Sequence, residues 1–385
     1  MKKFLSIVLC ACMLCAMLAG CGSSNSPAAA VEGDVLKVGI FEPATGENGA
    51  GGMQEVLGAR YANQVVPSVT VNGKEYKIEL VEVDNQSDKT AAVTAAQNLV
   101  SSGVIAVIGS YGSGVSIAAG STFEQAKIPA IGGSCTNPQV TLGNDYYFRV
   151  CFLDPFQGTV MASYANNEGC KKAAVIMQNG DDYSTGLANY FADAFAKMDG
   201  CEVVYTGTYN TNETDFNAIL TAAKAADPDV LFIPVYYEDV ALIAVQASEV
   251  GVKAKLLGGD GWDGVLKKID ASSVSCLDGA LYCSHYSSQS SDERVQTFIK
   301  NYTEKFGEAP NTFAALGYDA AYMMTKAIEN AGSTDSAAIV EAMKNLEYDG
   351  ITGHMVFDEN RNPIKSAVIL EINGGAESFV ENYEK

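Results

Sequence analysis

The sequence predicts an α/β protein built from two doubly wound lobes. Short apolar runs typical of strands alternate with Ala-rich segments of helical spacing, which favours parallel sheets covered by helices on both faces. The number of these βα units exceeds that of a (βα)8 barrel, and their rhythm breaks in the last third of the chain. Both observations favour two lobes over a single barrel, although a barrel shares the alternation.

The first residues have the parts of a secretory signal. Lys2 and Lys3 precede an apolar run over residues 4–18, and small residues precede Cys21. The segment resembles a bacterial lipoprotein signal, in which the cysteine corresponding to Cys21 is lipidated and becomes the mature N-terminus. An uncleaved anchor helix is the alternative. Residues 1–20 are therefore expected to be removed, and residues 21–34 to form a flexible tether on the outer side of the bacterial cell membrane.

Charge and hydropathy exclude several classes of function. The net charge of −21 repels phosphate, which excludes a nucleic-acid binder, and the chain would not lie on an anionic membrane without its lipid. No segment after the signal has the uninterrupted apolar length of a spanning helix, so the body is expected to be soluble.

The cysteines favour neither a metal site nor a redox site. Cys10, Cys12 and Cys15 leave with the signal, and no CxxC pair occurs among Cys135, Cys151, Cys170, Cys201, Cys276 and Cys283. Cys170 and Cys201 each precede an apolar run. If the two runs are neighbouring parallel strands, a disulfide between them is geometrically possible.

The elements follow in order along the body. Strands are expected at residues 37–41, 77–83, 104–108, 129–132, 173–177, 202–206, 230–235 and 255–258. Helices are expected at residues 89–100, 187–198, 216–226 and 240–250. After residue 287 the pattern changes to helices at 292–306 and 312–331, a short helix, and an antiparallel strand pair at 354–357 and 367–372.

The stretch 106–121, AVIGSYGSGVSIAAGS, predicts a strand, a tight turn and a helix N-terminus. Free N–H groups and the helix dipole make such a turn favour an anion, and Gly112 and Gly114 let a ligand approach the backbone. The turn lacks the Lys of a P-loop and the spacing of a dinucleotide fingerprint, so Ser110, Ser113 and Ser116 suit a small carboxylate better than a polyphosphate. The alternative is a βα turn that binds nothing.

A second donor-rich turn is expected in IGGSCTNPQV, residues 131–140. Ser134 and Thr136 follow a short strand, and Pro138 stands where a first helical turn tolerates it. Ligands of doubly wound sheets bind beyond the carboxyl ends of the strands, so two such turns could hold one carboxylate between them. Thr136 could instead be only a helix N-cap.

Other strand ends offer groups for an amine and for a side chain. Asp260 lies between glycines in LLGGDGWDG, beside Trp262, and an acid facing a cleft is a natural partner for an ammonium group. Its alternative role is to cap a helix starting near Asp263. Two further strand ends carry tyrosines: Tyr236 and Tyr237 at one, and Tyr183 beside Asp181 and Asp182 at the other. The tyrosine rings could pack on a ligand side chain, or these residues could serve only as packing within the lobe.

From residue 37 to the C-terminus the chain resembles the leucine/isoleucine/valine-binding protein family, the branched-chain amino-acid group of type I periplasmic binding proteins that serve ABC transporters. The resemblance is carried by KVGIFEPATG, AVTAAQNLVSSGVIAVIGSYGSGVSIA, IGGSCTNP, DDYSTGLANYFADAF, YYEDVALIAVQASEVG, GGDGWDG and FGEAPNTFAALGYDA. It implies two Rossmann-like lobes, 35–153 with 285–365 and 154–284 with 366–385, joined by a hinge of three crossing segments.

The resemblance also implies roles for single residues. Ser113 and Thr136 would bind an α-carboxylate, the Ser134 carbonyl would accept from the α-ammonium group, and Asp260 would face it from the other lobe. The expected ligand-binding residues are Ser113, Ser134, Cys135, Thr136, Tyr183, Tyr236, Asp260, Trp262 and Phe313.

Two departures from the family leave the side-chain specificity open. The family carries an aromatic residue in the first loop, where this chain has GENGAGG, and a disulfide at the positions of Ser87 and Gly112. The lost aromatic leaves room that Trp262 could fill. Branched-chain, aromatic and small polar amino acids, or an amide such as urea, remain candidates.

The predicted function is therefore a monomeric substrate-binding lipoprotein that delivers an amino acid to the transmembrane subunits of an ABC permease, without cofactor, metal or catalytic residues. An amino-acid or amide sensor of the same fold is the first alternative. A hydrolase would have to use a carboxylate pair such as Asp181 with Asp260, because His285 and His354 stand in no hydrolase motif.

Overall fold

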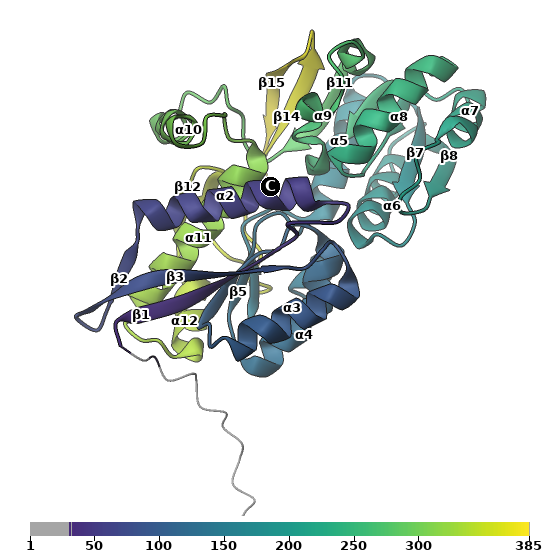
Figure 1. Cartoon of the computed structure of the whole chain (residues 1–385). Helices are drawn as coiled ribbons and strands as arrows, with labels where there is room; N and C mark the ends of the chain where they lie inside the picture. Colours follow the sequence, from purple (N-terminus) through teal and green to yellow (C-terminus); the bar gives the residue numbers. More distant parts are fainter. Residues whose placement is uncertain (1–30, 32, 385) are drawn as a thin grey trace, which may run out of the picture. The chain divides into compact units, whose positions relative to one another are not determined.

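The computed structural model describes residue 31 and residues 33–384, and Figure 1 shows how their elements are arranged. The predicted signal, Cys21 and most of the predicted tether lie outside the described residues. Residues 31–385 form one unit by their contacts, and the described part contains two large sheets.

The first sheet has the strand order β2-β3-β1-β4-β5-β6. Its strands run parallel except for β2, which pairs with β3 across a tight turn in which Asn72 and Gly73 both have positive φ angles, as such hairpins require. The strands are β1 (Val35–Glu42), β2 (Ser68–Val71), β3 (Lys74–Asp84), β4 (Ala106–Ile108), β5 (Ala130–Gly132) and β6 (Tyr147–Arg149).

Helices cover both faces of this sheet (Figure 1). α3 (Lys89–Ser101) and α4 (Ser113–Ala126) pack around Phe41 and Val107 on one face. On the other face, α2 (Gly49–Val65) lies along α11 (Thr312–Ala331), where a side chain at Gly58 would collide with the carbonyl of Ala314. α10 (Glu293–Phe306) and α12 (Ser336–Lys344) extend this helical layer, and together these elements form the first lobe.

The second sheet has the order β15-β14-β11-β10-β9-β7-β8, parallel from β11 to β8 and antiparallel at β14 and β15. Its strands are β7 (Lys172–Gln178), β8 (Glu202–Tyr209), β9 (Val230–Phe232), β10 (Lys255–Gly258), β11 (Ala280–Ser284), β14 (Ala367–Asn373) and β15 (Ala376–Tyr383). The helices of this second lobe are α5 (Asp154–Asn167), α6 (Asp182–Ala196), α7 (Asn217–Ala225), α8 (Tyr237–Val250) and the short α9 (Val265–Lys268).

The chain passes between the lobes three times: between β6 and α5, after β11, and before β14. These stretches are called the crossing segments below. The prediction of two doubly wound lobes with mainly parallel sheets is confirmed.

Some sequence predictions were wrong. The expected pairing of residues 354–357 with 367–372 does not occur, because β13 (Gly353–Met355) pairs with its neighbour β12 (Tyr348–Gly350). The apolar β14 pairs instead with β11 and β15 in the second sheet. Cys170 and Cys201 do stand at the starts of neighbouring strands, but both thiols are free, and the Cys201 Sγ lies 3.8 Å from the Cys170 carbonyl oxygen.

Candidate functional site

The turn after β4 has the predicted form of strand, glycine-rich turn and helix. Gly109 and Gly112 have φ angles of +120° and +92°, and a side chain at Gly109 would collide with the Phe41 carbonyl oxygen. The helix α4 begins at Ser113, whose hydroxyl oxygen accepts the N–H of Asn137 at 3.1 Å. The two donor-rich turns are therefore joined to each other, as expected for adjacent strand ends.

The turn after β5 is fixed from behind by Arg149. Its buried guanidinium donates to the carbonyl oxygens of Cys135 and, at 2.8 Å, Asn137. The helical cap is Asn137, whose side chain accepts the N–H of Gln139, so the alternative role of Thr136 as an N-cap is wrong. The Thr136 side chain is instead buried beside the Asp154 carboxyl.

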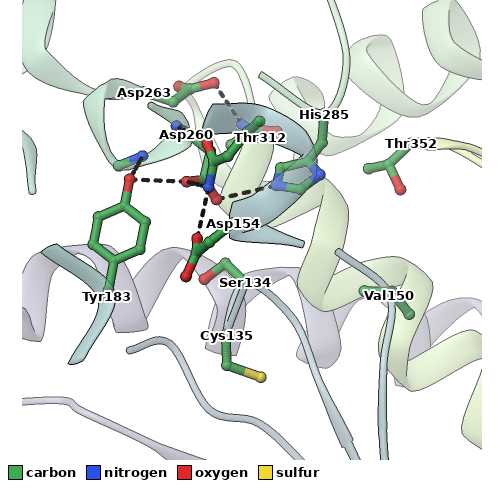
Figure 2. Close-up of polar contacts among 12 residues, drawn as sticks. Ser134, Cys135, Val150, Asp154, Tyr183, Asp260, Asp263, His285, Thr312 and Thr352 are labelled. Atoms are coloured by element: carbon green, nitrogen blue, oxygen red, sulfur yellow. Dashed lines mark hydrogen bonds and ion pairs between the residues drawn. The ribbon is translucent and has the colours of Figure 1, made fainter. Parts of the chain in front are cut away.

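Asp260 is 1% exposed and lies at the centre of a hydrogen-bond network that Figure 2 shows. Its Oδ1 accepts from the Tyr183 hydroxyl at 2.9 Å and from the Gln157 side-chain amide at 3.0 Å. The Nε2 of His285 lies 3.1 Å from its Oδ2. Asp260 does not cap a helix, because α9 begins after Gly264 and has no side-chain cap.

A chain of contacts connects Asp260 with the two turns. The Gln157 amide also donates to Asp154 at 3.0 Å, and the Asp154 N–H donates to the Thr136 carbonyl at 3.1 Å. Burial and the nearby Asp260 raise the pKa of Asp154 to about 8, so its carboxyl holds a proton at neutral pH. Ser113, Thr136 and Asp260 are thereby gathered around one region where the lobes meet.

The sequence and the fold are similar to those of known proteins. A sequence profile described as periplasmic binding protein matches residues 35–376. The chain belongs to the periplasmic binding protein family. It is 29% identical over 336 residues to Leu/Ile/Val-binding protein homolog 1 of Brucella suis, covering 86% of this chain and 88% of that protein.

Two solved structures are similar to this chain in sequence and fold. The leucine binding protein LivK of Thermotoga maritima is 34% identical, with a TM-score of 0.85 and coverage of 91% of this chain and 99% of that chain. The branched-chain amino-acid transporter substrate-binding protein LivJ of Streptococcus pneumoniae, in complex with isoleucine, is 31% identical, with a TM-score of 0.82 and coverage of 90% and 99%.

Aromatic side chains from both lobes meet next to the two turns of this periplasmic binding protein. Tyr183 and Tyr236 have ring centroids 5.0 Å apart, and Tyr236 and Tyr111 5.3 Å apart. Tyr111 contacts Phe313 edge to face at 4.8 Å. The structure thus brings together three of the expected aromatic residues through Tyr111, which the sequence reasoning missed.

Trp262 does not fill the room left by the missing family aromatic. Its indole is fully buried in the second lobe, donates to the Ile233 carbonyl at 2.7 Å and stacks on Tyr282. The space beside the first loop is occupied by Tyr111, because Gly51 of α2 lies directly against its ring. The Cys135 thiol likewise points away from Asp260 (Figure 2) and packs against Gly132.

Residues 31 and 33–384 contain no group of three or more His, Cys, Asp or Glu side chains that could hold a metal ion. No helix in this described part has both the length and the apolar character needed to cross a membrane.

Proposed function

We propose that this chain is an extracytoplasmic lipoprotein that binds an amino acid between its two lobes and delivers it to the membrane subunits of an ABC transporter. The family and the relatives named for leucine, isoleucine and valine support the ligand class. The ligand is bound and released unchanged, so the protein acts as a carrier and not as an enzyme.

One observation carries the proposal: uncharged donor turns and a buried acid converge from the two lobes. The turns at Ser113 and Thr136 offer N–H and hydroxyl groups to a carboxylate, and Asp260 offers a negative charge to an ammonium group. Such an arrangement favours a zwitterion over a simple anion. Tyr183, Tyr236 and Phe313 are proposed to surround the ligand side chain.

The proposal includes the anchor and the lobe boundaries. Cys21 carries the lipid, and the protein works as a monomer at the membrane. We assign residues 35–153 and 285–365 to the first lobe and residues 154–284 and 366–385 to the second. The three passages of the chain between the sheets support these limits.

The experiment is a thermal-shift screen against the twenty amino acids, small amides and purines, followed by calorimetry of each hit. A ligand that binds only the native state raises its apparent stability. We expect a branched-chain or related amino acid to bind with micromolar or better affinity, about −8 kcal/mol. A screen in which only non-zwitterions bind would contradict the proposal.

A further inference from the structure

Two buried glutamates lie directly behind the donor turns. Glu42 is the last residue of β1, and Glu55 projects from α2, with exposures of only 2% and 1%. A side chain at Gly109 would meet Glu42, and one at Gly133 would meet Glu55, so the two carboxyls lie at the carboxyl ends of β4 and β5.

Each carboxyl holds one of the two turns through one oxygen. The Oε2 of Glu42 accepts the N–H of Tyr111 at 2.6 Å in the first turn. The Oε1 of Glu55 accepts the hydroxyl of Ser134 in the second turn. The other oxygen of each, Oε1 of Glu42 and Oε2 of Glu55, is buried and has no donor from another residue.

The two carboxyl groups interact directly, because each shifts the pKa of the other. Two ionised carboxylates in contact in a dry space repel strongly, whereas one shared proton gives both remaining oxygens a partner. Neither carboxyl forms an ion pair with a Lys, Arg or His within the described range 33–384. Burial raises the pKa of both groups, most strongly that of Glu42.

In the part of the chain that the structure describes, no charged or titratable group around Glu42 and Glu55 takes the place of a proton shared between them. Cys135 and Asp260 add negative potential, and Tyr147 donates its hydroxyl to the Gly109 carbonyl. Arg149 is the nearby cation, but its guanidinium is used by the carbonyl oxygens of the second turn.

We propose that Glu42 and Glu55 share one proton and act as a positioning pair, which holds the Tyr111 and Ser134 turns in the geometry that binds the amino acid only while that proton is present. This inference rests on the proposed function for its effect on affinity. Loss of the proton would place two charges against each other and drive α2 away from both turns. Ligand affinity would then fall as the pH rises.

The test compares pH profiles of affinity for the wild type and Glu42→Gln. The amide of the variant donates to Glu55 permanently and needs no shared proton. Between about pH 6 and about pH 9 we expect the wild type to lose about tenfold more affinity than Glu42→Gln, the effect of one pKa unit. The matched control is Glu82→Gln, an exposed residue paired with Arg60, which should keep the wild-type profile. Superimposable profiles for wild type and Glu42→Gln would overturn the proposal.

A second measurement needs no ligand, so its failure is distinct from failure of the proposed function. The infrared difference spectrum between wild type and Glu42→Gln at neutral pH should show the carbonyl stretching band of one protonated carboxyl group. If Glu42→Gln does not fold, Glu55→Gln serves the same purpose. Absence of that band, with carboxylate bands alone in the difference, would contradict the shared proton.

Discussion

The Nε2 of His285, the first residue after β11, lies 3.1 Å from Oδ2 of Asp260. The imidazole also stacks on Phe152, with ring centroids 3.7 Å apart, and Phe152 belongs to another crossing segment. The proposed ammonium partner is thus oriented by residues of two of the crossing segments. Burial lowers the pKa of His285 to about 4, so the ring is neutral near pH 7 and donates one N–H to Asp260.

The buried neutral His285 predicts a loss of stability in acid. Below the ordinary histidine pKa of 6.5 the unfolded chain takes up a proton that the folded chain accepts only near pH 4. Stability therefore falls by about 3 kcal/mol as the pH drops through this window. Urea unfolding at several pH values would measure the stability of the wild type and of His285→Phe. The fall in stability with decreasing pH that comes from His285 should be absent in the variant.

The control for this experiment is the other histidine, His354, which is half exposed. His354→Phe should keep the wild-type slope. Equal slopes for wild type and His285→Phe would contradict the neutral buried ring.

The buried Lys365 predicts that the stability changes with pH in the alkaline range. Its buried ammonium donates to the Val150 carbonyl at 3.1 Å and to the Thr352 hydroxyl at 2.8 Å, which joins the crossing segments before β14 and after β6. Burial lowers its pKa to about 8, so the folded chain releases a proton that the unfolded chain keeps up to about pH 10.5. The contribution of Lys365 to stability should therefore rise across this window.

The variant Lys365→Met removes both hydrogen bonds while filling similar space. At pH 7 we expect a loss of about 3 kcal/mol, because two buried acceptors lose their partner. The difference from wild type should grow toward about pH 9.5, as chemical unfolding can measure. A difference that shrinks with pH would contradict the low pKa.

The donor turns predict moderate effects on affinity. Ser113→Ala and Thr136→Ala each remove one hydroxyl from the proposed carboxylate site, and we expect about tenfold weaker binding, ~1.4 kcal/mol, by calorimetry. Ser121→Ala on the exposed face of α4 is the control and should bind as wild type does. Unchanged affinity in both turn variants would show that the ligand carboxylate binds elsewhere.

The sequence predicted the two turns because strand, glycine turn and helix start are local patterns. It missed α2, whose first turn contains Gly49, Gly51 and Gly52, residues that disfavour helices. The helix forms because those glycines let it approach Pro43 and Tyr111. Here tertiary packing outweighs local propensity.

The groups around Asp260 could not be predicted in the same way. Gln157 lies 103 residues away and His285 25 residues away, and no local pattern connects them with Asp260. Glu42, however, directly follows the strand predicted at residues 37–41, so the rule that identified Ser113 could also have identified Glu42.

The most direct test of the account is a thermodynamic cycle on Asp260 and the ligand ammonium group. Calorimetry would measure the affinity of the wild type and of Asp260→Ala for two ligands, the amino acid identified by the screen and its des-amino analogue. The account predicts that the variant binds the amino acid about 100-fold more weakly, ~3 kcal/mol, while affinity for the des-amino analogue hardly changes. Equal losses for both ligands, or no loss for either, would contradict the pairing of Asp260 with the ammonium group.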